Sequence, residues 1–237
     1  MMLVKASTMN PMAQIHDLTP GRALYFAGVG LHGGRYNRLC ILPRATPGFW
    51  LRTQQAPAGF PLTVSQVSGT RRCTTVSGIQ TVEHVLAALY GLGISAADLV
   101  IDGDEFPILD GSALPVTQAL QQCTPRALMS HRRTLRVTRG FELKEDNWWI
   151  RVRPAKGLHL HYTLDYTLSQ QERYVLSGHY RPEEGFREAL APARTFVFER
   201  DVVALRAAGQ ALGGTLENAL VLDDAGRAIN SPRFDNE

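Results

Sequence analysis

The sequence has few cysteines and little net charge. Its three cysteines, Cys40, Cys73 and Cys123, include no C-x-x-C pair. An odd number without paired spacing argues against a disulfide framework and favours a reducing compartment, so we expect a cytoplasmic protein. The net charge of +3 is too small to indicate a nucleic-acid-binding protein, and no dense block of lysine and arginine supports one.

The sequence also lacks an apolar run that could cross a membrane. Its most apolar stretch, Val82 to Ile101, is interrupted by two acidic residues, a histidine and two glycines. The first 20 residues contain four methionines and two prolines but no apolar core of a signal peptide. We therefore expect residues 1–20 to form a loose N-terminal tail.

Hydrophobic residues make up 44% of the chain, which is enough for a folded core. Residues 22–29 and 38–43 have the aromatic and apolar content of strands. Between them, residues 28–33 match the letters G-x-G-x-x-G of a dinucleotide-binding loop. That loop must be followed by a helix, whereas here a second strand follows, so we predict a tight turn instead.

The clearest helix is predicted over Thr81–Tyr90. Val82, Val85 and Leu89 recur on one face, and Thr81 is a typical N-cap residue. A short strand over 98–102, a turn over 107–112 and a second helix over 113–123 are expected to follow.

The chain turns polar and basic near 125–133, which we interpret as a domain boundary. We expect a first domain over 21–126 and a second over 132–237. In the second, we predict strands over 143–153, 158–168 and 219–222, and helices near 183–190 and 200–208. The helices are too few to separate every pair of strands, so the pattern favours an α+β fold of layered sheets and helices.

Glu83 and His84 begin the predicted helix. An imidazole can ligate a metal, and a neighbouring carboxylate can take a proton from metal-bound water. Adjacent helical residues point about 100° apart, so one can bind metal while the other stays free. The pair alone is weak evidence, because most such dipeptides lie on solvated surfaces.

Two other groups of residues could take part in chemistry. His159 and His161 would share one face of a strand and could bind metal, although ordinary cross-strand packing is the commoner role. Thr195 could donate a hydrogen bond to a developing oxyanion, and Phe196 could pack on a sugar. An edge strand with a surface Arg194 is the simpler interpretation of the second group.

A set of motifs, in order, is more specific than any one of them. They are GVGLH (28–32), TVEH (81–84), AALYGLGI (87–94), EFPILDGSA (105–113), ARTF (193–196), LGGT-x-x-NA (212–219) and RF-x-x-E (233–237). Together they resemble the UDP-3-O-acyl-N-acetylglucosamine deacetylases, zinc amidases of lipid A biosynthesis. The resemblance covers residues 23–237.

The resemblance implies two similar α+β domains, each a sheet packed with helices, with the active site between them. It implies that zinc-activated water removes the N-acetyl group from UDP-3-O-acyl-N-acetylglucosamine, in a protein that is a monomer. By the same resemblance, His84 is a zinc ligand and Glu83 the general base, whereas Asp110 supports the cleft.

The resemblance assigns further residues to the oxyanion and the substrate. Thr195 would support the oxyanion and Phe196 would lie beside the sugar. Leu212, Gly214 and Thr215 belong to the stretch that would line the passage for the acyl chain.

The second and third zinc ligands of the family, a His and an Asp, would follow the motif at 233–237, and a later His would act as the acid. These 237 residues contain none of the three. We therefore expect the second domain to be incomplete, and this chain to be inactive and prone to self-association. The alternative is a non-catalytic paralog that binds a UDP-sugar, an acyl chain or a protein partner.

Overall fold

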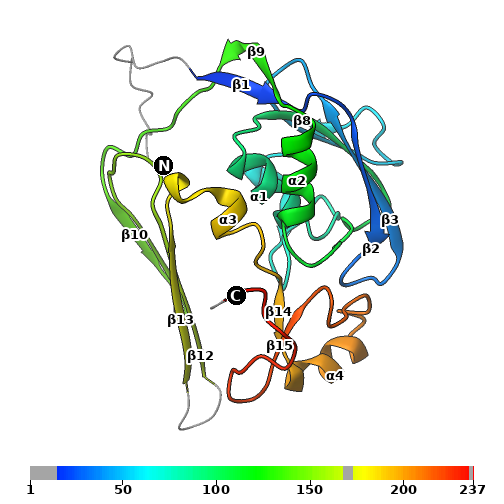
Figure 1. Ribbon diagram of the computed structural model, residues 1–237, viewed down its shortest axis with the longest axis vertical. Coiled ribbons are helices and arrows are strands. Elements are labelled where there is room, and N and C mark those ends of the chain that lie inside the picture. The colour runs from blue at the N-terminus through cyan, green and yellow to red at the C-terminus, as the bar shows by residue number, and fades with distance from the viewer. Residues whose placement is uncertain (1–14, 168–172, 235–236) are drawn as a thin grey trace.

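The computed structural model describes residues 15–167, 173–234 and 237, and combines several β-sheets with few helices (Figure 1). This confirms the α+β class. The strands are β1 (His16–Thr19), β2 (Leu24–Val29), β3 (Tyr36–Pro43), β4 (Gly48–Arg52), β5 (Phe60–Pro61), β6 (Val67–Gly69), β7 (Thr75–Val76), β8 (Ala96–Asp102), β9 (Arg126–His131), β10 (Phe141–Lys144), β11 (Trp149–Val152), β12 (Leu160–Thr167), β13 (Arg173–Tyr180), β14 (Phe196–Phe198) and β15 (Leu220–Leu222). The helices are α1 (Glu83–Gly91), α2 (Leu114–Gln122), α3 (Phe186–Ala189) and α4 (Glu199–Ala207), with 3-10 turns η1 (Val64–Gln66) and η2 (Pro182–Glu184).

A five-stranded sheet in the order β2-β3-β8-β4-β5 organises the first half of the chain. β2 and β8 run antiparallel to β3, β4 pairs parallel with β8, and β5 closes the edge antiparallel to β4. The glycine turn at residues 30–35 joins β2 to β3 as a hairpin. The prediction of a tight turn rather than a dinucleotide-binding loop is therefore confirmed.

The main core lies between this sheet and helices α1 and α2 (Figure 1). Leu39 and Ile41 of β3 are buried, whereas Arg38 before them is exposed and Cys40 between them is half-buried, as alternation along a strand requires. Val85 and Leu89 of α1 pack into the same core. The predicted apolar stripe of the first helix is confirmed, and this packing fixes how α1 presents its first turn.

The second half of the chain consists of smaller pieces. β10 and β11 form one antiparallel hairpin, and β12 and β13 a longer one. β14 and β15 pair in parallel, and Phe198, Leu220 and Leu222 form a small separate core. The ring of Tyr166 on β12 meets the ring of Phe198 edge-on, with 5.4 Å between centroids. The hairpin thus packs on this core through the ring of Tyr166.

Four residues of the predicted N-terminal tail form a strand. Residues 1–14 lie outside the described part of the chain, but His16–Thr19 form β1, which pairs with β9. Two polar side chains of β1 form hydrogen bonds with residues of the first half of the chain. Thr19 accepts a hydrogen bond from the Arg44 N–H at 2.8 Å, and Asp17 accepts one from the Ser95 hydroxyl at 2.8 Å. Composition alone gave no indication of these long-range partners.

The prediction of one continuous strand over 143–153 is wrong. The Glu145 N–H donates to the Trp148 carbonyl at 2.9 Å, which closes a turn between β10 and β11. Asp146 and Asn147 lie in this turn, and both residue types favour turns over strand interiors. The other predicted helices and strands have observed counterparts, displaced by a few residues at most.

Candidate functional site

Glu83 and His84 occupy the first turn of α1, as predicted. Thr81 is not the N-cap of this helix, however: Val82 holds that position, without a side-chain capping bond. Thr81 has a φ of 59°, and its hydroxyl instead donates to a carboxylate oxygen of Glu105 at 2.9 Å. The Thr81 hydroxyl therefore does not cap α1. It ties Thr81, just before the N-cap of that helix, to Glu105.

Glu105 joins the glycine turn to the start of α1. Its side chain is 1% exposed. Besides Thr81, it accepts hydrogen bonds from the backbone N–H groups of His32 and Gly33, each at 2.8 Å. A Cβ on Gly30 would come within 2.3 Å of this carboxylate. The GVGLHG motif therefore folds around Glu105, a role that its match to a phosphate-binding pattern did not suggest.

The candidate base is itself held in place. A carboxylate oxygen of Glu83 accepts a hydrogen bond from the Thr74 N–H at 2.9 Å. His84 is partly buried, and burial lowers the pKa of its imidazole, while the charges of Glu83 and Asp110 act in the opposite direction.

Thr195 and Phe196 reach the same region from the second half of the chain. The Thr195 N–H donates to the Gly111 carbonyl at 2.8 Å, so Thr195 adjoins the turn that also carries Asp110. Phe196 begins β14, and its ring meets that of Tyr166 edge-on at 6.1 Å. The structure therefore places Thr195 beside the Asp110 turn, whereas the ring of Phe196 lies against the β12–β13 hairpin.

The loop that carries Leu212, Gly214 and Thr215 is joined to the glycine turn. The N–H groups of Leu212 and Gly213 donate to the carbonyls of His32 and Leu31, at 3.1 and 3.0 Å. The Leu212 side chain is 51% exposed, which leaves it available to a ligand.

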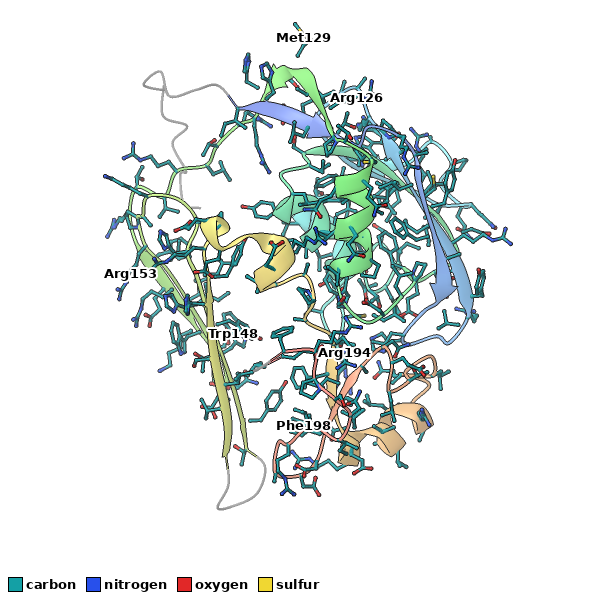
Figure 2. All side chains as sticks on the ribbon, in the orientation of Figure 1. Arg126, Met129, Trp148, Arg153, Arg194 and Phe198 are labelled. Carbon is teal, nitrogen blue, oxygen red and sulfur yellow. The ribbon has the colours of Figure 1, made fainter. Side chains whose placement is uncertain are left out.

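Arg194 is the principal residue that sequence reasoning misjudged. It was expected at the surface, but its side chain is 5% exposed and forms an ion pair with the fully buried Glu237, with 2.7 Å between Nε and Oε1 (Figure 2). Arg233 in turn pairs with Asp110 at 2.9 Å. Two arginines therefore hold residues 231–234 and Glu237 beside the Asp110 turn. The motifs ARTF and RF-x-x-E contained both partners, although their pairing could not be deduced from the sequence.

The second candidate metal pair does not form. His159 precedes β12 and its ring bonds to the Lys156 carbonyl at 3.0 Å, whereas the His161 ring lies 6.0 Å from that of His179 on β13. The commoner interpretation, cross-strand packing, is confirmed for His161. Within residues 15–167, 173–234 and 237, no group of three His, Cys, Asp or Glu side chains is placed to hold a metal ion.

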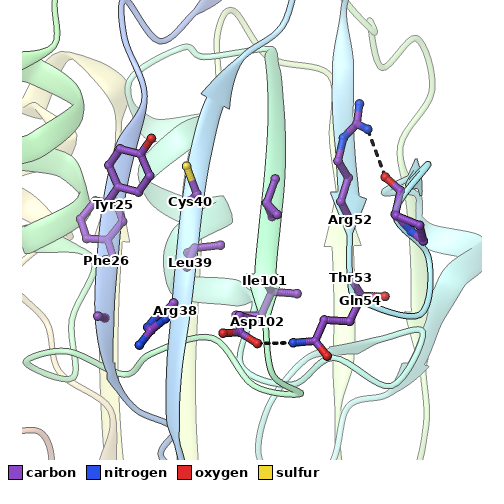
Figure 3. Close-up of a pocket in the computed structure, with 13 residues that line it drawn as sticks. Tyr25, Phe26, Arg38, Leu39, Cys40, Arg52, Thr53, Gln54, Ile101 and Asp102 are labelled. Carbon is purple, nitrogen blue, oxygen red and sulfur yellow. Dashed lines mark hydrogen bonds between the residues drawn. The ribbon is translucent and has the colours of Figure 1, made fainter.

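A groove of about 470 Å³ lies elsewhere, on the face of the five-stranded sheet that carries Arg38 and Cys40 (Figure 3). Arg52 and Asp102 line it, and Gln54 donates to Asp102 at 2.5 Å. None of the candidate site residues lines this groove. The site is therefore defined by the chain segments that meet at Asp110, and not by this hollow.

Comparison with known proteins assigns the chain. The sequence profile of the family described as LpxC, UDP-3-O-acyl N-acetylglycosamine deacetylase, matches residues 18–237. This chain belongs to the UDP-3-O-acyl-N-acetylglucosamine deacetylase family. The family's enzymes are deacetylases, which are hydrolases.

Three relatives show the extent of the similarity. The deacetylase of Photobacterium profundum is 37% identical over an alignment of 224 positions, which covers 89% of this chain and 72% of that protein. The deacetylase of Anaeromyxobacter dehalogenans is 35% identical over 90% of this chain and 70% of its own length. The deacetylase of Shewanella oneidensis is 35% identical over 94% of this chain and 76% of its own length.

Two further features concern the cysteines and the hydropathy of the helices. All three cysteines are free thiols. Among the helices that the structure describes, none has both the length and the hydropathy that a membrane span requires.

Proposed function

We propose that this chain carries the active-site residues of a deacetylase that acts on UDP-3-O-acyl-N-acetylglucosamine. The observation that carries the proposal is the meeting of three motifs at residues 105–111: Thr81, two residues before Glu83, bonds to Glu105, Thr195 bonds to Gly111, and Arg233 pairs with Asp110. In this proposal, Glu83 is the general base and His84 a zinc ligand. Membership of the family supports the substrate.

Thr195 and four further residues would bind the substrate. The Thr195 hydroxyl would donate to the oxyanion that forms when water attacks the amide. Phe196 would contact the sugar, and Leu212, Gly214 and Thr215 would border the acyl chain. The attachment of residues 211–215 to the glycine turn supports a fixed wall at this place.

The donor set does not fit a complete zinc site. A catalytic zinc needs about three protein ligands, and the described residues gather no such group around His84. We propose that the 237-residue polypeptide on its own binds zinc weakly and has negligible deacetylase activity.

An assay of acetate release tests this proposal. The purified 237-residue polypeptide is incubated with UDP-3-O-acyl-N-acetylglucosamine and added zinc, beside a Glu83→Gln variant. We expect no release above the variant. Release that depends on Glu83 would show that other ligands complete the site, and the proposed inactivity would be wrong. Release that does not depend on Glu83 would contradict its assignment as the base.

A second candidate function is a non-catalytic binding protein, favoured by the incomplete donor set. Such a protein would bind a UDP-sugar, an acyl chain or a protein partner. Isothermal titration with UDP-3-O-acyl-N-acetylglucosamine, using the parent and Leu212→Asp, tests whether the polypeptide binds this ligand at all. Binding of the acylated nucleotide that Leu212→Asp weakens, without turnover, would favour the second function.

The location, the domains and the oligomeric state of this chain are also proposals. We propose a cytoplasmic protein, supported by the free thiols, with domains over 21–126 and 132–237. The family resemblance suggests a monomer. The exposure of Leu143, Ile150 and Tyr162 on the two hairpins, at 54%, 52% and 66%, supports self-association of this chain.

A further inference from the structure

The segment from Arg126 to Arg139, which we call the arginine strap, comprises β9 and the chain that continues from it toward β10 (Figure 1). It contains five arginines, and no acidic residue occurs between Gly111 and Phe141. The net charge of the whole chain is only +3. The strap therefore concentrates positive charge in one part of a nearly neutral molecule.

The charges of the strap are available to a partner. Arg126, Arg133, Arg136 and Arg139 are exposed, and none forms an ion pair with another described residue. The acidic residue on the neighbouring strand β1, Asp17, is 4% exposed and already accepts a hydrogen bond from Ser95.

Apolar side chains project between these arginines. Met129 is 93% exposed and Leu135 83% exposed. Figure 2 shows Met129 extending away from the ribbon beyond β9. Ile15, 65% exposed, adjoins the strap because its carbonyl accepts the Arg132 N–H at 2.8 Å. A single exposed apolar residue is ordinary. Exposed apolar residues interleaved with arginines, however, form a surface that can contact anionic groups and an apolar phase together.

We propose that the arginine strap docks this protein on an anionic phospholipid bilayer. The guanidinium groups would pair with headgroup phosphates, which suit their planar, forked geometry. Met129 and Leu135 would enter the boundary between headgroups and acyl chains. A nucleic acid fits less well, because the strap contains no Phe, Tyr or Trp on which bases could stack.

The proposal does not depend on the deacetylase site. None of Glu83, His84, Thr195, Phe196 and Leu212 lies in the strap, so membrane docking can hold or fail whatever the chemistry of that site.

Flotation with lipid vesicles tests the proposal, because bound protein rises with the vesicles whereas aggregates sediment. The vesicles are made of phosphatidylcholine, with or without phosphatidylglycerol. The strap variant is Arg133→Gln with Arg136→Gln. The control is Arg181→Gln with Arg187→Gln, which removes the same charge from exposed positions near Glu183 and Glu188.

We expect the parent to float with anionic vesicles only, and less at high salt. Each basic side chain near an anionic leaflet changes the partition constant about five-fold, so the strap variant should bind about 25-fold more weakly. The control variant should float like the parent. Met129→Ser, which changes no charge, should also reduce flotation several-fold.

Three results would overturn the proposal. One is equal flotation with neutral and anionic vesicles. Another is that the strap variant floats like the parent, or that the control variant loses as much flotation as the strap variant. The third is a parent that does not float but binds a fluorescent single-stranded RNA, with binding lost in the strap variant, which would make the surface a nucleic-acid site.

Discussion

At the scale of the residue, Glu105 fixes the start of α1, although it lies well after that helix in the sequence. It accepts hydrogen bonds from His32, Gly33 and Thr81, and so holds the residue that precedes the Glu83-His84 turn. Glu105→Ala should lower the free energy of unfolding by on the order of 3 kcal/mol, because three buried donors lose a charged acceptor. Urea unfolding measures this. Glu217→Ala, at an exposed position, is the control, and equal stability of the two variants would contradict the role of Glu105.

A second prediction at this scale concerns pH. Burial raises the pKa of Glu237, but hydrogen bonds from Arg194 and from the Arg233 N–H outweigh burial and hold that pKa below its usual value. A lowered pKa gives stability that is present above the unfolded-state pKa of about 4.3 and is lost as the pH falls through the folded-state value.

Glu237→Gln should therefore cost on the order of 3 kcal/mol at neutral pH, since it leaves Arg194 buried without a charged partner. The gap in unfolding free energy between parent and variant should close below about pH 4. Unfolding curves at neutral and acidic pH measure it. A gap that stays constant with pH would mean that the charge of Glu237 contributes nothing.

At the scale of the element, the loop at 211–215 and the glycine turn approach each other closely. A Cβ on Gly213 would lie 2.2 Å from the Gly30 carbonyl oxygen, a backbone atom that cannot turn away. Gly213→Ala should separate the two loops and destabilise the protein by about 2 kcal/mol. Gly178→Ala, whose Cβ meets nothing within 4 Å, is the matched control in thermal unfolding. A Gly213→Ala variant as stable as the control would contradict this close approach.

The elements of the main core were largely predictable, because their signals are local. The apolar stripe of α1 and the alternation in β3 each follow from a few consecutive residues. The pairing of β1 with β9 was not predictable, because its partners are more than a hundred residues apart. The burial of Arg194 escaped prediction for the same reason: it is set by Glu237, 43 residues away.

At the scale of the whole molecule, the two halves of the chain differ in how they are stabilised. The first has one continuous core between a sheet and two helices, and the second has two hairpins and a small aromatic cluster. Hydrogen bonds at Gly111 and at Leu31 and His32 join them. The deacetylase site proposed above lies where this junction meets α1, so its chemistry depends on both halves.

The central claim is that His84 is a zinc ligand whose partners are not all supplied by these 237 residues. The most direct test is the zinc content of the purified 237-residue polypeptide after dialysis, beside His84→Ala and, as a matched control, His161→Ala. We expect zinc well below one per chain in all three proteins. Near-stoichiometric zinc that is lost only in His84→Ala would show that this chain completes the site by itself and would contradict the account.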